Sequence, residues 1–504
     1  MLKLAEKNRK WWILLAMSSS LALVFIDQTA LAVALPAIQR ELNLSNSLSQ
    51  WVINAYLLAL SAIILLGGKI GDRLGHKRAF LAGVIVFITA STLAALAESG
   101  AWLITARAIQ GIGAAFMMPS TNALVTNAFP AQERGKALGI YIALATIFLA
   151  LGPLLGGFLT QVFSWRAVFW INFPIALISI ILAISSVPTW RRREKLNIDY
   201  LGFFISVIFI SGFVLGFMEA PNWGWTSLPI MGLFLLSIIS LITFIGWEKK
   251  IPHPLVELTL FKNLTFTTLF SVLLIIQAVA IVFVFLAIFL QNVLHYSPLM
   301  AGLLLLPAMV PIMLMAPVGG HLRDKYGPTL PMFCGALLVV LSLIWIAIFS
   351  HNRGYAWLFP GLLVYGIGMP LILSGIMATV MNMVNAQQRG MASAIFNCAR
   401  QFGNTIGLAL LTGLLASVNK WQLNSFLHHS PVPLSRLKEQ QIDGLLVQSD
   451  QAMKAIAHLS LAHIELLKTA ALNAYTNAFS MTLLAAAILA FLSLFLILKR
   501  PRKQ

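Results

Sequence analysis

Asp27 is the only acidic residue deep inside a long apolar run of this chain, the run 12–36. A carboxylate at the centre of a bilayer costs roughly 2.5–3.5 kcal/mol on insertion scales, so such residues usually face a cavity and carry function. A carboxyl group that is neutral in one environment and charged in another can carry a proton or attract a cation. Asp27 is therefore predicted to bind a proton, a cationic substrate or both. The alternative is a structural acid that is hydrogen-bonded to a neighbouring helix.

Arg107 and Arg400 are the two basic residues inside apolar runs. Arg107 lies on the order of 9–10 Å from the nearer end of its helix, so an internal role competes with snorkelling of the side chain to the surface. Arg400 lies nine residues inside the run 391–417, too deep for easy snorkelling. We expect it to face an internal cavity as a counter-charge, with a purely structural role as the alternative.

Two short motifs occur twice in the chain. The stretch 67–78, rich in glycine and charge, lies between two apolar runs and returns at 319–327 with an offset of 252 residues. A second pair, 134–137 and 389–392, has an offset of 255 residues. Two motifs repeated at nearly the same offset indicate a duplicated membrane bundle, an arrangement found in many secondary transporters.

The composition assigns the chain to the membrane class. It is 59% hydrophobic and only 10% charged, whereas soluble proteins average about 25% charged residues. The formal charge of +18 would suit a nucleic-acid binder, but the basic residues lie in short loops between apolar runs. The orientation rule of membrane proteins explains that distribution better. We therefore expect a lipid bilayer around the protein and no nucleic-acid partner.

The apolar runs are long enough to cross a bilayer as helices, which takes about twenty residues. Their length, and the lack of alternating ten-residue segments, excludes a membrane β-barrel. Fourteen spans are predicted at 12–36, 51–67, 79–97, 101–127, 137–161, 167–187, 200–219, 226–246, 266–291, 299–319, 331–350, 355–383, 391–417 and 475–498. The expected fold is all-α: two six-helix bundles with two extra central helices.

The basic residues predict the orientation and the division into domains. With the N-terminus in the cytoplasm, 24 of the 34 Lys and Arg fall in cytoplasmic segments, so both termini are expected there. The predicted domains are a first bundle at 1–190, a linker with two extra helices at 191–262, and a second bundle at 263–504. The last includes an outer loop, 418–474, in which amphipathic helices are expected at 441–470. That loop would cap the outer mouth or, alternatively, dock an outer adaptor partner.

Four motifs carry a resemblance to a known family. They are Gly68-x3-Asp72-Arg73-x-Gly75-His76-Lys77-Arg78, Arg107-Ala-Ile-Gln110-Gly111-x-Gly113, Gly152-Pro153-x2-Gly156-Gly157 and Ile171-Asn172-x-Pro174. They are similar to the loop signature, the fourth-helix signature, the fifth-helix exporter signature and the sixth-helix entry of the major facilitator superfamily. With the extra helices at 200–246, the chain resembles the fourteen-helix drug:proton antiporter branch over almost its whole length.

The resemblance implies roles for the intramembrane residues. Arg107 would be a proton-relay residue that tunes a carboxylate such as Asp27. Gly152 and Gly156 lie one turn apart on one helix face, so another helix can pack closely there. Pro153 and the adjacent Gly157 permit a bend. In an exporter this contact would favour antiport, whereas ordinary helix packing is the alternative.

The resemblance also implies a conformational latch, which would form when the protein is open outward. Its residues would be Gly68, Asp72, Arg73, Gly75, Lys77, Arg78 and Asp324. Asp72 and Asp324 are expected to satisfy the N-terminal amides of a neighbouring helix. His76 and Asn127 depart from the family pattern, in which arginine and an acid are common, so Lys77 or Arg78 is a possible substitute in the latch.

The resemblance implies a proton-coupled antiporter that exports amphipathic, cationic drugs or toxic compounds across the bacterial cytoplasmic (inner) membrane. The alternative is a dedicated exporter of one metabolite, lipid or siderophore on the same scaffold. The chain contains no Asp-x2-Asp pair, catalytic His/Cys cluster or phosphate-binding glycine loop, so an enzyme is not expected. No metal and no cofactor beyond the proton-motive force are expected, and the protein should act as a monomer.

Overall fold

The computed structural model describes residues 8–130, 133–188, 199–252, 254–383, 389–429 and 461–499, and it is helical. The first bundle consists of α1 (Arg9–Glu41), α2 (Asn46–Leu74), α3 (His76–Ala95), α4 (Gly100–Ala128), α5 (Arg134–Val162), α6 (Ala167–Trp170) and α7 (Asn172–Ser186). The second consists of α10 (Leu264–Ala280), α11 (Val282–Asn292), α12 (Pro298–Tyr326), α13 (Thr329–Phe349), α14 (Tyr355–Met383), α15 (Arg389–His429) and α18 (Leu461–Leu498). Between them come α8 (Tyr200–Trp223), α9 (Leu228–Glu248) and a short 3-10 helix, η2 (Leu258–Lys262), and a second 3-10 helix, η3 (Ser350–Asn352), precedes α14.

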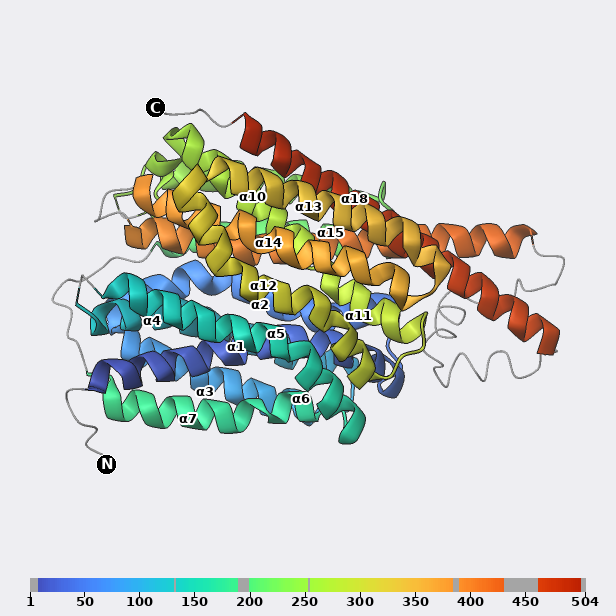
Figure 1. Ribbon diagram of the computed structural model, residues 1–504, viewed down its shortest axis with the longest axis horizontal. Coiled ribbons are helices and arrows are strands. Elements are labelled where there is room, and N and C mark those ends of the chain that lie inside the picture. The colour runs from blue at the N-terminus through green and yellow to red at the C-terminus, as the bar shows by residue number, and fades with distance from the viewer. Residues whose placement is uncertain are drawn as a thin grey trace.

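The predicted all-helical membrane fold is confirmed. Within the described ranges, 13 helical segments are long and apolar enough to cross a membrane. Two of these segments contain a local break, between α6 and α7 and between α10 and α11. The remaining predicted span, 137–161, lies on α5. Figure 1 shows the two bundles side by side, with α1 beginning and α18 ending at the same end of the molecule.

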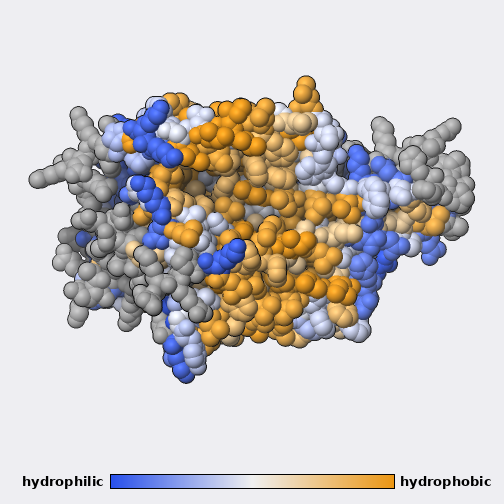
Figure 2. Space-filling model, turned by 90° about the horizontal axis from the view of Figure 1, so that it is seen from above, coloured by the Kyte–Doolittle hydropathy of each residue, from blue (hydrophilic) through white to orange (hydrophobic). Residues whose placement is uncertain are grey.

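The surface carries a continuous apolar belt. Figure 2 shows hydrophobic residues across the middle of the molecule and hydrophilic residues at its two ends. The belt includes many large exposed side chains, among them Leu235 and Ile242 of α9 and Ile488 of α18. Exposed apolar area on this scale is incompatible with water and typical of a surface that faces lipid. The protein is therefore a multi-pass membrane protein.

The extra hairpin α8–α9 packs on α2 of the first bundle and α15 of the second. Val214 and Met218 of α8 form a small buried cluster with Ala409 of α15. Near one end of the hairpin, the Trp51 indole of α2 donates a 2.9 Å hydrogen bond to Glu219. The hairpin therefore contacts both bundles along one side of their interface. This position explains how two inserted helices leave the duplicated arrangement of the bundles intact.

The predicted outer loop 418–474 is too long at both ends. Helix α15 continues to His429 and α18 begins at Leu461, and Figure 1 shows both extending beyond the bundle. The Asn477 amide of α18 donates a 3.0 Å hydrogen bond to Gln422 of α15, so the two helices pair there. A hydropathy pattern detects only the part of a helix that crosses the lipid. It therefore does not predict that α15 and α18 continue beyond the membrane as paired helices. Of the expected amphipathic segment 441–470, residues up to 460 lie outside the described ranges.

Candidate functional site: a buried carboxylate–guanidinium network

Asp27 and Arg107 form an ion pair inside the first bundle. Both side chains are 0% exposed, and Nη1 of Arg107 lies 2.5 Å from Oδ2 of Asp27. Nε of Arg107 donates a 3.0 Å hydrogen bond to the carbonyl oxygen of Val52 on α2. The structure therefore brings together two residues that lie 80 positions apart in the sequence, and Arg107 does not extend to the surface.

Two amide side chains complete the network. Nε2 of Gln110 donates to Oδ1 of Asp27 at 2.9 Å, and Oε1 of Gln110 accepts from Nη1 of Arg107 at 2.5 Å. Gln110 is three residues after Arg107, so both side chains project from the same face of α4. Nδ2 of Asn172, the first residue of α7, lies 3.3 Å from Oδ1 of Asp27 and 3.0 Å from the Ser91 hydroxyl of α3.

Aromatic rings surround the guanidinium. The Cζ atom of Arg107 lies 4.3 Å from the ring centroid of Tyr56 and 5.8 Å from that of Phe169. Cation–π contacts of this kind stabilise a desolvated arginine. Residues of α1, α2, α3, α4, α6 and α7 therefore converge on one carboxylate. Among the described residues, the contacts of this site all come from the first bundle.

The hydrogen-bond donors of the network are arranged around the carboxyl group of Asp27. When Asp27 is ionised, two N–H donors of α4 and one of α7 surround its oxygens. Protonation would remove the negative partner of a buried arginine, which is strongly unfavourable unless the arginine finds another partner. Nη2 of Arg107 and Oδ1 of Asn172 are buried and have no hydrogen-bond partner among the described residues. These atoms are where a water or a ligand would meet the pair.

Sequence reasoning does not single out Gln110 or Asn172 as functional residues. Both lie in motifs that carry the family resemblance, and both are amides within predicted spans. The spacing of Gln110, three residues after Arg107, predicts a contact between the two side chains, because side chains at that spacing are neighbours on a helix. The contact of Asn172 with Asp27 joins residues 145 positions apart, and no local pattern reports it.

Replacing Arg107 by lysine should impair transport although the positive charge is retained. The guanidinium donates from Nη1 to Asp27 and Gln110 and from Nε to the Val52 carbonyl group. The single nitrogen of a lysine ammonium cannot reproduce this planar arrangement of donors. We expect the export rate to fall by roughly 5- to 150-fold, the range of a coupling energy of about 1–3 kcal/mol. The measurement is substrate efflux from proteoliposomes under an imposed pH gradient. Arg353→Lys, in the connection between α13 and α14, is the matched control and should transport normally.

The predicted exporter motif packs on α1 within one turn of Asp27. A methyl group added at Gly156 of α5 would meet the backbone of Ala30 on α1, and one added at Gly152 would meet the Thr29 side chain. Thr29 and Ala30 follow Asp27 by two and three residues on the same helix. The Gly152–Gly156 face therefore holds α5 against the part of α1 that carries the carboxylate.

The other face of the motif contacts the second bundle. A methyl group at Gly157 would meet the backbone of Pro298 and Leu299, and one at Gly302 of α12 would meet the Pro153 carbonyl group. The motif thus lies between α1 and α12. On both sides the helix backbones approach so closely that only the hydrogen side chain of glycine fits between them. The matching pair in the second bundle, Gly403 and Gly407, packs in the same way on Leu274 and Ala278 of α10.

All predicted latch residues except Asp324 lie around the junction of α2 and α3. Gly75 joins these helices with φ = +93°, a left-handed conformation that glycine adopts without strain. Asp72 lies 3.3 Å from Nε2 of His76, one turn along the chain. Gly68 faces Pro119 of α4, where an added methyl group would lie 3.6 Å from Cβ.

The basic latch residues contact other helices. Nζ of Lys77 lies 2.5 Å from the Val187 carbonyl oxygen and 3.2 Å from that of Ile184, so it neutralises the C-terminal end of α7. Arg73 donates a 3.4 Å hydrogen bond to the Tyr200 hydroxyl of α8. Arg78 is exposed. Asp324 lies in the last turn of α12, and its side chain is outside the described residues.

Arg400 links the two bundles, and its contacts in the described part of the chain do not include Asp27 or Arg107. This half-buried residue of α15 places its Cζ atom 5.4 Å from the ring centroid of Phe25 on α1. Phe25 is two residues before Asp27. The structure therefore brings Arg400 to the carboxylate-bearing segment of α1 through a cation–π contact.

Comparison with known proteins places the chain among transporters. Residues 17–408 match the family model of the Major Facilitator Superfamily. The chain is 32% identical over 84% of its length, and 79% of the relative's, to the multidrug resistance protein Stp of Mycobacterium tuberculosis (strain H37Rv). It is 31% identical to the tetracenomycin C resistance and export protein of Streptomyces glaucescens, with 82% of this chain and 77% of the relative covered. A solved bacterial homologue of the lysosomal transporter Spinster superposes with a TM-score of 0.68 at 18% identity, covering 99% of this chain and 98% of that one.

Proposed function

Since this chain belongs to the Major Facilitator Superfamily, we propose that it is a proton-coupled antiporter that exports amphipathic, cationic compounds across the bacterial cytoplasmic (inner) membrane. Relatives named for drug resistance support drug export in general. The observation that carries the proton coupling is the fully buried Asp27, whose oxygens are held by Arg107, Gln110 and Asn172. Both termini lie in the cytoplasm in this proposal, and the monomer is the working unit.

In the proposed cycle, Asp27 exchanges a proton for a cationic substrate. An entering proton supplies roughly 2.3 kcal/mol per 100 mV of membrane potential. Protonation of Asp27 releases Arg107, whose positive charge then opposes a second cation nearby. The glycine contacts of α5 with α1 and α12 transmit the change at Asp27 to the interface between the bundles. Proton and cation are thus never bound together, which is the requirement for antiport.

Inside-out vesicles with an acidic lumen test this proposal against that of a dedicated exporter. Tetraphenylphosphonium, ethidium and a neutral amphiphile would be added in turn while a lumenal dye reports pH. Loss of lumenal protons on adding several unrelated cations is the expected result. Correctly folded protein that responds to none of the three compounds would instead favour a dedicated exporter of one metabolite, lipid or siderophore.

A further inference from the structure

A polar seam runs between α2 of the first bundle and α15 of the second. We use this name for six buried side chains: Gln50, Asn54 and Ser61 of α2, and Gln401, Thr405 and Thr412 of α15. On each helix the three residues are spaced i, i+4 and i+11, so they share one face. The two faces meet where the Thr405 hydroxyl lies 3.0 Å from the Leu57 carbonyl oxygen and 3.2 Å from the Ser61 hydroxyl.

Most polar atoms of the seam have no partner among the described residues. They are Oε1 of Gln50, both amide atoms of Asn54, Oε1 of Gln401 and Oγ1 of Thr412. Asn54 is 0% exposed, Gln401 1% and Thr412 4%. Leaving a buried donor or acceptor unsatisfied costs about 1–3 kcal/mol. These atoms at the interface of the two bundles are available to a polar ligand group or to water.

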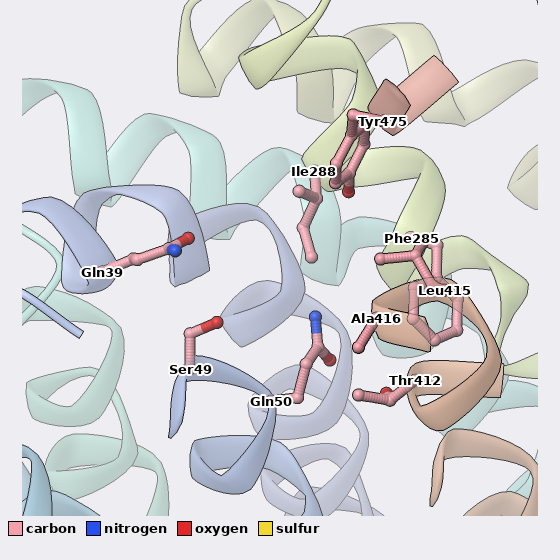
Figure 3. A pocket seen from close by; sticks show the side chains of 9 residues that line it. All are labelled: Gln39, Ser49, Gln50, Phe285, Ile288, Thr412, Leu415, Ala416 and Tyr475. Carbon is pink, nitrogen blue, oxygen red and sulfur yellow. The ribbon is translucent and has the colours of Figure 1, made fainter. Parts of the chain in front are cut away.

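A small cavity lies at one end of the seam. It measures about 20 Å³, and its lining includes Gln50 of α2, Thr412 of α15, and Phe285 and Ile288 of α11. Figure 3 shows the Gln50 amide directed toward Thr412 and Ala416. This volume is about that of one water molecule. A larger ligand group can therefore enter only when α2 and α15 separate, as alternating access requires.

The seam contains no ionisable side chain. The neighbouring basic residue, Arg400, contacts Phe25 on α1. Amides and hydroxyls recognise neutral donors and acceptors, whereas the charge of a substrate is matched by the carboxylate of Asp27. The seam and Asp27 thus offer two different kinds of recognition in one molecule.

We infer that the polar seam is the subsite for neutral hydrogen-bonding groups, such as hydroxyl, carbonyl or amide groups, of the exported compound. The inference rests on the proposed export function. It adds a second recognition element to the charge of the substrate. Compounds with the same charge and similar bulk should therefore be distinguished by a single hydroxyl group.

Two matched probes test the inference: tetraphenylphosphonium and its analogue with one 4-(hydroxymethyl)phenyl ring, whose alcohol does not ionise near neutral pH. In the wild type, KM for the hydroxylated probe should be roughly 2- to 12-fold lower, which corresponds to about 0.5–1.5 kcal/mol for one hydrogen bond. The ratio of KM for tetraphenylphosphonium to KM for its hydroxylated analogue is then roughly 2 to 12 in the wild type. In Asn54→Leu and Thr412→Val this ratio should fall to about one. Thr482→Val is the control, because that hydroxyl is equally buried but bonded to the Ala478 carbonyl group at 2.7 Å.

The outcomes separate this inference from the proposed function. A wild-type ratio of about one, or a ratio unchanged in both variants, would overturn the inference while export stands. Wild-type protein that neither transports nor binds either probe would refute export of amphipathic cations and the inference with it. Where a variant transports too slowly, equilibrium binding of both probes to the purified protein gives the same ratio.

Discussion

Replacing Asp27 by asparagine should severely impair proton-coupled export. Asparagine keeps an oxygen for the Gln110 and Asn172 amides but cannot ionise, so it cannot exchange a proton for a cation. Efflux under an imposed pH gradient should fall by roughly 5- to 150-fold, the range of a coupling energy of about 1–3 kcal/mol. The measurement is efflux of tetraphenylphosphonium from proteoliposomes with and without the gradient. Wild-type efflux in Asp27→Asn would remove this carboxylate from the mechanism.

The loss of coupling must be separated from a loss of stability. Asp27→Asn leaves Arg107 as a buried charge without its counter-ion, and breaking such a pair costs about 3–5 kcal/mol. The double variant Asp27→Asn with Arg107→Gln removes both charges and should regain much of the thermal stability of the wild type. It should remain uncoupled. Recovery of gradient-driven export in the double variant would show that the pair has only a structural role.

Replacing Gly156 by alanine should also strongly impair transport. The added Cβ would lie 2.6 Å from Cα and 2.8 Å from the carbonyl carbon of Ala30, and a backbone cannot yield as a flexible side chain can. Overpacking of this kind costs about 1–3 kcal/mol, which exceeds the gain of about 0.8–1.0 kcal/mol in helix propensity. Helices α5 and α1 must move apart next to Asp27, so gradient-driven efflux should fall well below the wild-type rate.

Gly232→Ala is the matched control for the helix contact. Gly232 lies within α9, and an added methyl group there would meet nothing within 4 Å. This variant should gain slightly in thermal stability, because alanine is the better helix former, and should transport at the wild-type rate. Equal rates for Gly156→Ala and Gly232→Ala would mean that the α1–α5 contact tolerates expansion and has no part in transport.

Much of the fold is predictable from the sequence because lipid leaves few alternatives. A spanning segment must satisfy its backbone internally, so long apolar runs become helices. The paired extension of α15 and α18 is not predictable in this way, because it lies outside the apolar belt. Its stability comes from tertiary packing between distant parts of the chain, as the burial of Leu423 of α15 and Leu467 of α18 in the apolar core indicates.

The candidate site was predictable only in part. Asp27 and Arg107 are conspicuous because charge is rare in apolar runs. Their direct contact, the amides that surround them and the partner of Lys77 at the end of α7 depend on how helices pack. The same holds for the polar seam, whose residues look unremarkable on either helix alone. It becomes evident only when α2 and α15 face each other.

The central claim is that proton and cation compete through Asp27, and proton release on substrate binding tests it most directly. Purified protein in weak buffer with a pH indicator would be titrated with tetraphenylphosphonium. We predict that the wild type releases protons in proportion to the bound cation, whereas Asp27→Asn releases none. Cation binding without proton release in the wild type, or equal release in the variant, would contradict the account.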